Sequence, residues 1–168
     1  MKKNMIWAIV AKNGAVVDWY TSSFKLKKLE ELLEVNSGNA SIVMNEALHK
    51  KIQERSPEFL SDHIVVISNQ DLSNLFEETD ETMDNPRNRF FIGDYDVFAE
   101  LLTRFKEEVD EIFKLVLPIE IPCEQCFPFL DIDEDWKKQS AKIMRSDEDI
   151  EYDCEVIQYT NAKPKTLL

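Results

Sequence analysis

The chain has 168 residues, and its composition, 43% hydrophobic and 10% aromatic, is that of a folded globular protein rather than a disordered one. This length predicts one domain, residues 1–168. The formal net charge of −13 argues against direct binding to nucleic acid or to an anionic membrane, and it leaves open a basic partner.

No stretch is apolar for the roughly 18 residues that a membrane-spanning helix needs. The chain starts with a pair of lysines and a short apolar run, residues 5–11, but no small-residue cleavage site follows. We interpret this run as the first strand of a cytoplasmic protein. Three cysteines, an odd number, favour reduced thiols over a disulfide framework.

The first half of the chain alternates strand and helix patterns. Residues 5–11 predict a central strand covered on both faces, and residues 15–17 continue it beyond an Asn-Gly turn signal. Leucines at three- and four-residue spacing predict a helix over residues 24–35. Residues 41–44 predict a short strand, followed by a helix that ends before Pro57.

The alternation continues in the second half. Residues 63–68 predict a buried strand and residues 72–81 a short acidic helix. A strand over residues 89–92 leads into a helix over residues 95–109, and a long strand is predicted over residues 112–119.

The last part of the chain has the pattern of a β hairpin. Residues 137–145 and 151–159 predict two antiparallel strands joined by an acidic turn. Strands that alternate with helices and then close in a hairpin predict an α/β fold. We expect a mostly parallel twisted sheet of about eight strands with an antiparallel C-terminal edge, flanked by about four helices.

Six segments, in this order, are similar to those of one enzyme family: MIWAIVAKNGAVVD, SIVMNEALHKKI, IVVISNQ, FFIGDYDVFAELL, CFPFLDIDEDWKKQS and YDCEVIQYTN. Together they resemble dihydrofolate reductase over nearly the whole chain. The resemblance implies that family's fold, and an activity in which NADPH reduces a pterin by hydride transfer.

The resemblance also implies a glycine-rich turn for the cofactor, because residues without a Cβ let a pyrophosphate approach backbone N–H groups. Only Gly93 remains here, and Asp94 and Asp96 follow it. A carboxylate about 4 Å from a phosphate costs up to about 4 kcal/mol at an effective dielectric constant of about 20. The turn therefore predicts the loss of dinucleotide binding.

The second phosphate site of the family is altered in the same direction. Glu46 stands where the family has an arginine, and Leu48 stands where it has a hydroxyl residue. We expect Asn45 to cap the helix that begins there. A polar turn that matches the family's adenosine-phosphate region does persist, and it consists of Ser68, Asn69 and Gln70.

The resemblance implies a buried carboxylate that anchors the pterin and supports its protonation. Counted from the first strand, Glu31 takes this position; counted back from residues 42–44, Leu29 takes it. Leu115 stands where the family has a polar threonine, and the arginine that grips the substrate's tail falls near residues 61–62. The implied pocket positions are Ile9, Ala11, Leu32, Val35, Ile92, Phe98 and Leu115.

Cys123 and Cys126 have the spacing of half a zinc site. Only Cys154, His49 and His63 are present to complete it, so we expect no metal.

The leading hypothesis is a divergent dihydrofolate-reductase-like protein that has lost NADPH-dependent reduction, holds no cofactor, and binds an unidentified protein or small ligand. The alternative is an active but unusual NADPH-dependent reductase of dihydrofolate or a related pterin, with Glu31 as its acid and the cofactor near Gly93 and residues 68–70. A third hypothesis is an acidic inhibitor that imitates DNA for a basic target.

Overall fold

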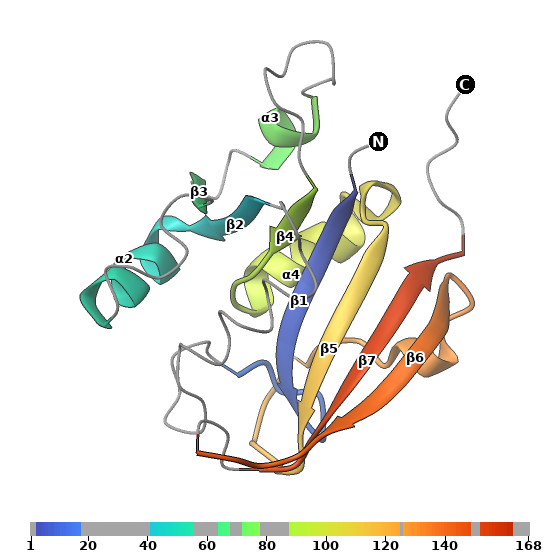
Figure 1. Ribbon diagram of the computed structural model, residues 1–168. Coiled ribbons are helices and arrows are strands. Elements are labelled where there is room, and N and C mark those ends of the chain that lie inside the picture. Colours follow the sequence, from blue (N-terminus) through green and yellow to red (C-terminus); the bar gives the residue numbers. More distant parts are fainter. Residues whose placement is uncertain are drawn as a thin grey trace.

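Seven strands and three α-helices make up the regular structure of the described residues, and the strands form one sheet (Figure 1). The computed structural model describes residues 3–17, 41–55, 64–67, 72–77, 88–124, 126–148 and 152–162. The elements are β1 Asn4–Ala11, β2 Ser41–Asn45, α2 Glu46–Arg55, β3 Ile64–Ile67, α3 Leu72–Glu77, β4 Arg89–Phe91, α4 Tyr95–Thr103, β5 Glu111–Leu117, β6 Trp136–Met144 and β7 Cys154–Asn161.

The strand order is β3-β2-β4-β1-β5-β7-β6. Strands β1 to β5 are mutually parallel, and β7 runs antiparallel to both β5 and β6. The predicted mostly parallel sheet with an antiparallel C-terminal edge is confirmed. The described residues contain seven strands and three α-helices, fewer than the expected totals of about eight and about four. The helix predicted over residues 24–35 lies outside the described residues.

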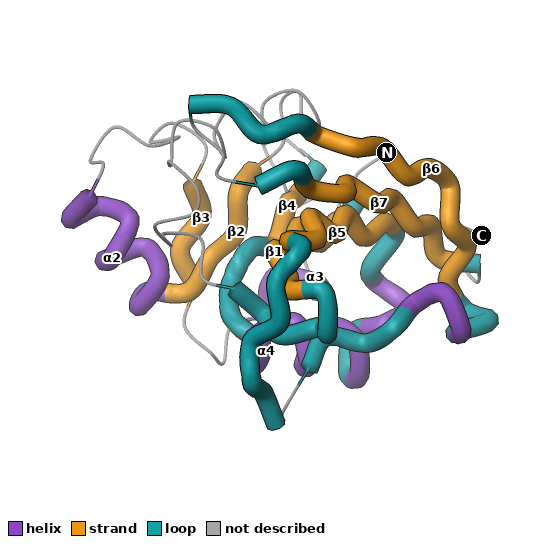
Figure 2. The backbone as a smooth tube through the Cα atoms, turned by 90° about the horizontal axis from the view of Figure 1, so that it is seen from below, coloured by secondary structure: helices purple, strands orange, loops and turns teal. Residues whose placement is uncertain are grey.

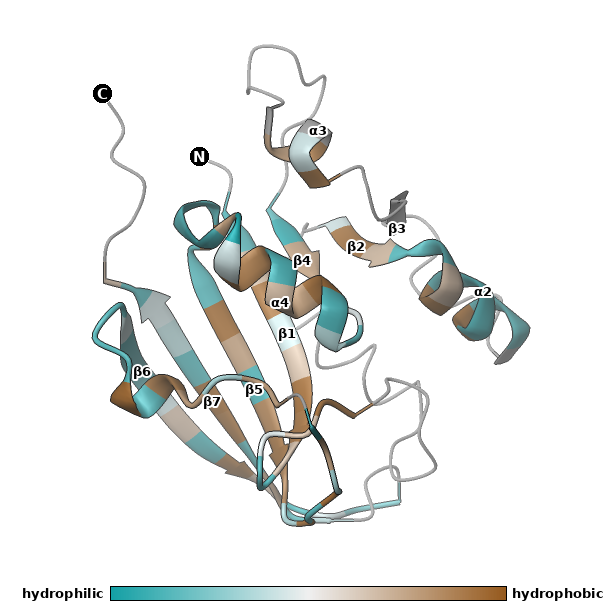
Figure 3. Cartoon of the chain, turned by 180° about the vertical axis from the view of Figure 1, so that it is seen from behind, coloured by the Kyte–Doolittle hydropathy of each residue, from teal (hydrophilic) through white to brown (hydrophobic). Residues whose placement is uncertain are grey.

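β1 is the centre of the core, and all of its residues are buried. Because side chains alternate along a strand, it contributes to two clusters. Trp7 and Ile9 belong to the cluster that contains Leu48 and Ile52 of α2. Ile6, Ala8 and Val10 belong to the cluster on the other face, where Val97, Phe98 and Leu101 of α4 pack. Figures 2 and 3 show α4 lying across this second face.

The chain turns back after β1, so the prediction that residues 15–17 continue the strand is wrong. Gly14 has φ +94°, a backbone conformation that glycine adopts at least cost. The Ala11 N–H donates to the Ala15 carbonyl at 2.8 Å, and the Val17 N–H donates to the Ile9 carbonyl at 2.8 Å. The segment therefore lies alongside the end of β1.

Two further boundaries differ from the sequence prediction. α4 ends at Thr103 rather than at residue 109, and a 3₁₀ turn, Lys106–Glu108, follows. Val109 is fully buried in the core and is already extended, so the chain must leave the helix to reach β5. β7 begins at Cys154 rather than at residue 151, and directly before it the Asp153 carboxylate accepts a hydrogen bond from the Ser146 N–H at 2.7 Å.

The described residues contain no helix that is long and apolar enough to cross a membrane.

Replacing Gly14 with alanine tests the turn. The new Cβ would lie 3.1 Å from the Phe127 carbonyl oxygen, in a left-handed conformation that costs an L-residue about 1–2 kcal/mol. Gly93→Ala is the matched control, because its Cβ would only crowd Val97 at 3.3 Å. We expect urea denaturation to give Gly14→Ala the larger loss of unfolding free energy; an equal or smaller loss would contradict the role of the turn.

Candidate functional site

Two helices begin at the same edge of the sheet. α2 starts at Glu46, directly after β2, and α4 starts at Tyr95, with three residues between it and the end of β4. β2 and β4 are parallel neighbours, so their carboxyl ends lie at one edge. In α/β folds this edge is where ligands bind, because helix N-termini point their N–H groups at it.

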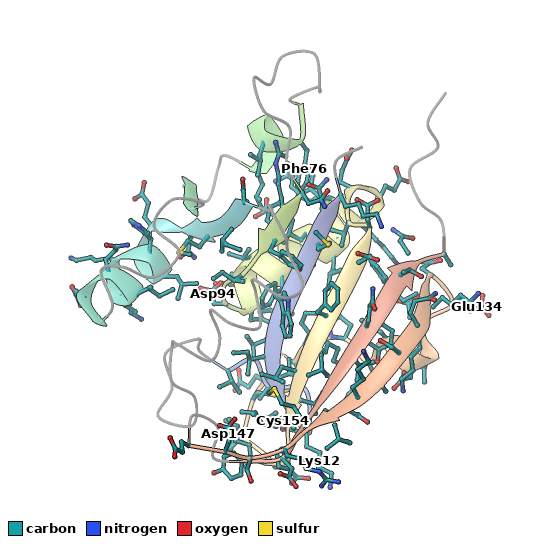
Figure 4. All side chains as sticks on the ribbon, viewed as in Figure 1. Lys12, Phe76, Asp94, Glu134, Asp147 and Cys154 are labelled. Carbon is teal, nitrogen blue, oxygen red and sulfur yellow. A yellow bond between two sulfur atoms is a disulfide. The ribbon has the colours of Figure 1, made fainter. Side chains whose placement is uncertain are left out.

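The N-terminus of α4 is capped by the chain's own carboxylate. Asp94 has extended backbone, φ −99° and ψ −176°, and its Oδ1 accepts a hydrogen bond from the Val97 N–H at 3.2 Å. Figure 4 shows Asp94 at the start of α4. The carboxylate thus takes a backbone N–H group that a bound phosphate would otherwise use.

Gly93 precedes this cap and is buried. A Cβ at this position would lie 3.3 Å from Val97 Cβ and Cγ2. The glycine packs closely against the first turn of α4, and a side chain here would require Val97 to shift by a few tenths of an ångström. Its backbone is not open toward solvent, as a phosphate-binding turn would be.

The N-terminus of α2 is capped in a similar way. Asn45 Oδ1 accepts a hydrogen bond from the Leu48 N–H at 2.8 Å, which confirms the predicted cap. Glu46, in the first turn, is exposed and is favoured there by the helix dipole. Both helix ends therefore use their own side chains as the acceptors that an anion would otherwise supply.

The structure brings together four of the predicted pocket residues. Ile9, Ala11, Ile92 and Leu115 belong to one core cluster, and each exposes 1% or less of its surface. Phe98 belongs to the cluster on the opposite face of the sheet.

The other predicted site residues lie outside the described residues. They are Leu29, Glu31, Leu32, Val35, Ser68, Asn69 and Gln70, together with the position near residues 61–62.

Cys123 and Cys126 form a disulfide, so the expectation of three reduced thiols is wrong. The two Cα atoms lie 6.3 Å apart, which is within the range that a disulfide spans. The odd number of cysteines is accounted for by Cys154, which is free and buried. Burial raises the pKa of the Cys154 thiol to about 11, so this thiol stays protonated at neutral pH.

The described residues contain no group of three or more side chains that could hold a metal ion. The disulfide accounts for this at the proposed half-site, because disulfide sulfurs are not thiolates and do not bind zinc as thiolates do.

Two polar contacts at the turn that follows β1 were not predicted from the sequence. Asn13 Nδ2 donates to the Ile121 carbonyl at 2.8 Å, and the Phe127 N–H donates to the Gly14 carbonyl at 2.7 Å. These contacts join the turn after β1 to the disulfide-bearing connection.

The sequence analysis did not identify the cap by Asp94 either, although an aspartate directly before an amphipathic helix is the usual sequence signal of such a cap.

Comparison with known proteins shows the fold. No protein-family model and no curated protein sequence matches the chain. A solved structure described as dihydrofolate reductase from Enterococcus faecalis complexed with NADP(H) and RAB-propyl is similar, with a TM-score of 0.66 and 13% identity. The alignment covers 95% of this chain and 96% of that chain. At this identity the likeness establishes a dihydrofolate-reductase-like α/β fold, as predicted.

Replacing Asp94 tests the cap. Asp94→Ala removes the acceptor for the Val97 N–H and is expected to lower the free energy of unfolding by about 1 kcal/mol. Asp94→Ser retains an acceptor and should recover most of the loss. Asp96→Ala, in the first turn of α4, is the control for charge alone. If Asp94→Ala and Asp96→Ala have equal effects in urea denaturation, Asp94 does not act as a cap.

Counting thiols tests the disulfide. In denaturant without reductant, we expect a chromogenic thiol reagent to detect only Cys154, and after reduction to detect Cys123 and Cys126 as well. Peptide mapping of the alkylated chain identifies each site. Detection of all the cysteines before reduction would contradict the pairing.

Proposed function

We propose that this protein is a binding protein built on a dihydrofolate-reductase-like fold, and that it does not carry out NADPH-dependent reduction. The observation that carries the proposal is the Asp94 carboxylate at the N-terminus of α4, 3.2 Å from the Val97 nitrogen. A dinucleotide phosphate at this end of the helix would meet a negative charge and compete for the same N–H group.

The neighbouring helix supports the same conclusion. At the start of α2 the Leu48 N–H is already taken by Asn45, and Glu46 adds a second exposed carboxylate to the first turn. A phosphate placed between the two helix ends would therefore displace two caps and gain no cation from either first turn, because neither contains a lysine or arginine.

The core beside this edge supports the loss of the pterin pocket. Ile9, Ile92 and Leu115 are each at least 99% buried, so they offer no open apolar surface for a ring to stack on. Leu115 also lacks the hydroxyl group that the family uses at its corresponding position.

A protein partner or a small ligand other than NADPH is the proposed target. The acidic stretch that includes Asp131, Asp133 and Asp135 is engaged within the fold, since Lys106 bonds Asp135 at 2.6 Å and lies 3.8 Å from Asp133. Lys138 lies 3.5 Å from Asp131. Acids paired in this way present less free charge to a basic partner, which makes imitation of DNA the weaker form of the proposal.

NADPH titration tests the proposal. At low salt we expect no saturable micromolar binding by calorimetry or by cofactor fluorescence, while a functional dihydrofolate reductase in the same buffer binds. Asp94→Gly, which removes the carboxylate, is the matched variant and is expected to weaken the electrostatic exclusion. Stoichiometric micromolar binding by the unmodified protein would overturn the proposal.

Adding dihydrofolate to the same samples tests the reductase alternative. That hypothesis expects consumption of NADPH, and a loss of most turnover in Glu31→Gln, because this residue is its proton-relaying carboxylate. The binding protein proposed here has no turnover to lose.

A further inference from the structure

A disulfide lies in the connection between β5 and β6, close to the turn that follows β1. Cys123 and Cys126 form it, three positions apart in the chain. Cys123 is exposed, as are its neighbours Pro122 and Glu124, while Cys126 is partly buried. A thiolate from solution therefore has easier access to Cys123 than to Cys126, and access is one of the factors that set the rate of thiol–disulfide exchange.

The residues before the disulfide are hydrogen-bonded to this turn. The Lys12 N–H donates to the Ile119 carbonyl at 2.8 Å. The Asn13 side chain bonds the backbone of Ile121 twice: its Nδ2 donates to the carbonyl at 2.8 Å, and its Oδ1 accepts from the N–H at 3.3 Å. These bonds hold the chain that leads into Cys123 against residues 12–13.

The residues at the other end of the disulfide pack on the same turn. The Phe127 N–H donates to the Gly14 carbonyl at 2.7 Å, and Cys126 forms an isolated β-bridge with Ala15. A Cβ placed on Gly14 would lie 3.2 Å from the Cys126 Cβ, so one half of the disulfide lies directly against the backbone of the turn. The disulfide therefore joins two segments that both contact residues 12–15.

We propose that the Cys123–Cys126 disulfide is a site of reversible thiol–disulfide exchange with a protein dithiol, which attacks at Cys123. A cross-link limits the conformations that are open to the segments it joins. Reduction therefore loosens the turn of residues 12–15, and re-formation of the disulfide tightens it again. The proposal uses neither of the helix caps at α2 and α4, so it is independent of the proposed function.

The exchange balances between the two proteins. A thiolate of the dithiol attacks the Cys123 sulfur, a new S–S bond forms, and the bond between Cys123 and Cys126 breaks. Cys126 leaves as a thiolate and takes up a proton. The second thiol of the dithiol loses its proton, attacks the sulfur of its own neighbour and releases Cys123 as a thiolate. This chain gains two electrons as a dithiol, and the partner loses two as a disulfide.

The surroundings favour attack at Cys123 and return of the bond to Cys126. After the disulfide opens, Cys126 stays held by its bridge with Ala15 and by the buried Phe127 that follows it. The mixed disulfide is carried by Cys123, which is exposed and so within reach of a protein partner. Cys154 does not compete, because it is buried and its thiol, with a pKa raised to about 11, is protonated at neutral pH.

Trapping the mixed disulfide tests the site. The oxidised full chain is incubated without air, under native conditions, with a thioredoxin that retains its attacking cysteine and lacks its second one, so that the mixed disulfide persists. We expect peptide mass spectrometry to find about tenfold more adduct at Cys123 than at Cys126. Cys126→Ser is the matched control, because it has no disulfide to attack and should give no adduct. Absence of an adduct in the unmodified chain, or as much adduct at Cys126 as at Cys123, would overturn the proposal.

Amide hydrogen exchange tests the effect on the turn. The Lys12 and Phe127 N–H groups both bond across it, and they are measured in the oxidised chain and in the chain reduced by complete thioredoxin. We expect about tenfold faster exchange at both after reduction, because local opening becomes easier. Exchange at Leu115, buried in β5, should not change. Equal exchange at Lys12 and Phe127 in the two forms, or faster exchange at Leu115 as well, would count against the proposal.

Reoxidation tests the reversibility. After the reductant is removed, oxidised glutathione should re-form the disulfide in the folded chain and restore slow exchange at Lys12 and Phe127. The double variant Cys123→Ser, Cys126→Ser is the control: it should exchange fast throughout and respond to neither treatment. Fast exchange that persists in the reoxidised chain, or a response in the double variant, would contradict the proposed switch.

Discussion

The complete burial of β1 is the constraint on which the rest of the structure depends. A strand with no exposed residue needs hydrogen-bonded neighbours on both edges and a covering layer on both faces. β4 and β5 supply the edges, and both run parallel to β1. Parallel pairing requires crossover connections, and this requirement places α4 on one face while α2 contributes to the other. The position of the helix N-termini follows from the burial of one strand.

The same arrangement creates an edge suited to anions, and the chain occupies it with its own acceptors. Asp94 and Asn45 each accept a hydrogen bond from one N–H group in the first turn of a helix, so at each end one of the N–H groups without an intrahelical partner is bonded without a ligand. Capping stabilises the fold, while phosphate binding would need the same N–H groups left free. At α4 the capping residue is a carboxylate that follows a buried glycine, and this cap is the basis of the proposal that the protein does not hold a dinucleotide phosphate.

The connection between β5 and β6 links two regions of the molecule. Its disulfide-bearing part bonds the Gly14 turn through Phe127 N–H. The following residues place the Phe127 and Phe129 rings and the Asp131 carboxylate around Lys114 and Tyr159. Burial, together with the hydrogen bond that the Tyr159 hydroxyl donates to Asp131, raises the pKa of Tyr159, so the phenol remains a donor. Lys114 is buried beside these rings, and its Nζ atom lies 5.7 to 6.0 Å from the ring centres of Phe127, Tyr159 and Phe129.

The sequence by itself determined the alternation of strands and helices, the burial of β1 and the cap at Asn45, because these depend on local periodicity and on neighbouring residues. It also predicted the antiparallel hairpin, with a shift at the start of β7. Only the tertiary structure decided that residues 15–17 turn back on β1, that Cys123 pairs with Cys126, and that Phe98 faces away from Leu115. It also decided that Lys114 is enclosed. Each of these depends on contacts between segments distant in the chain or on the path of a connection, and side-chain periodicity carries no information about either.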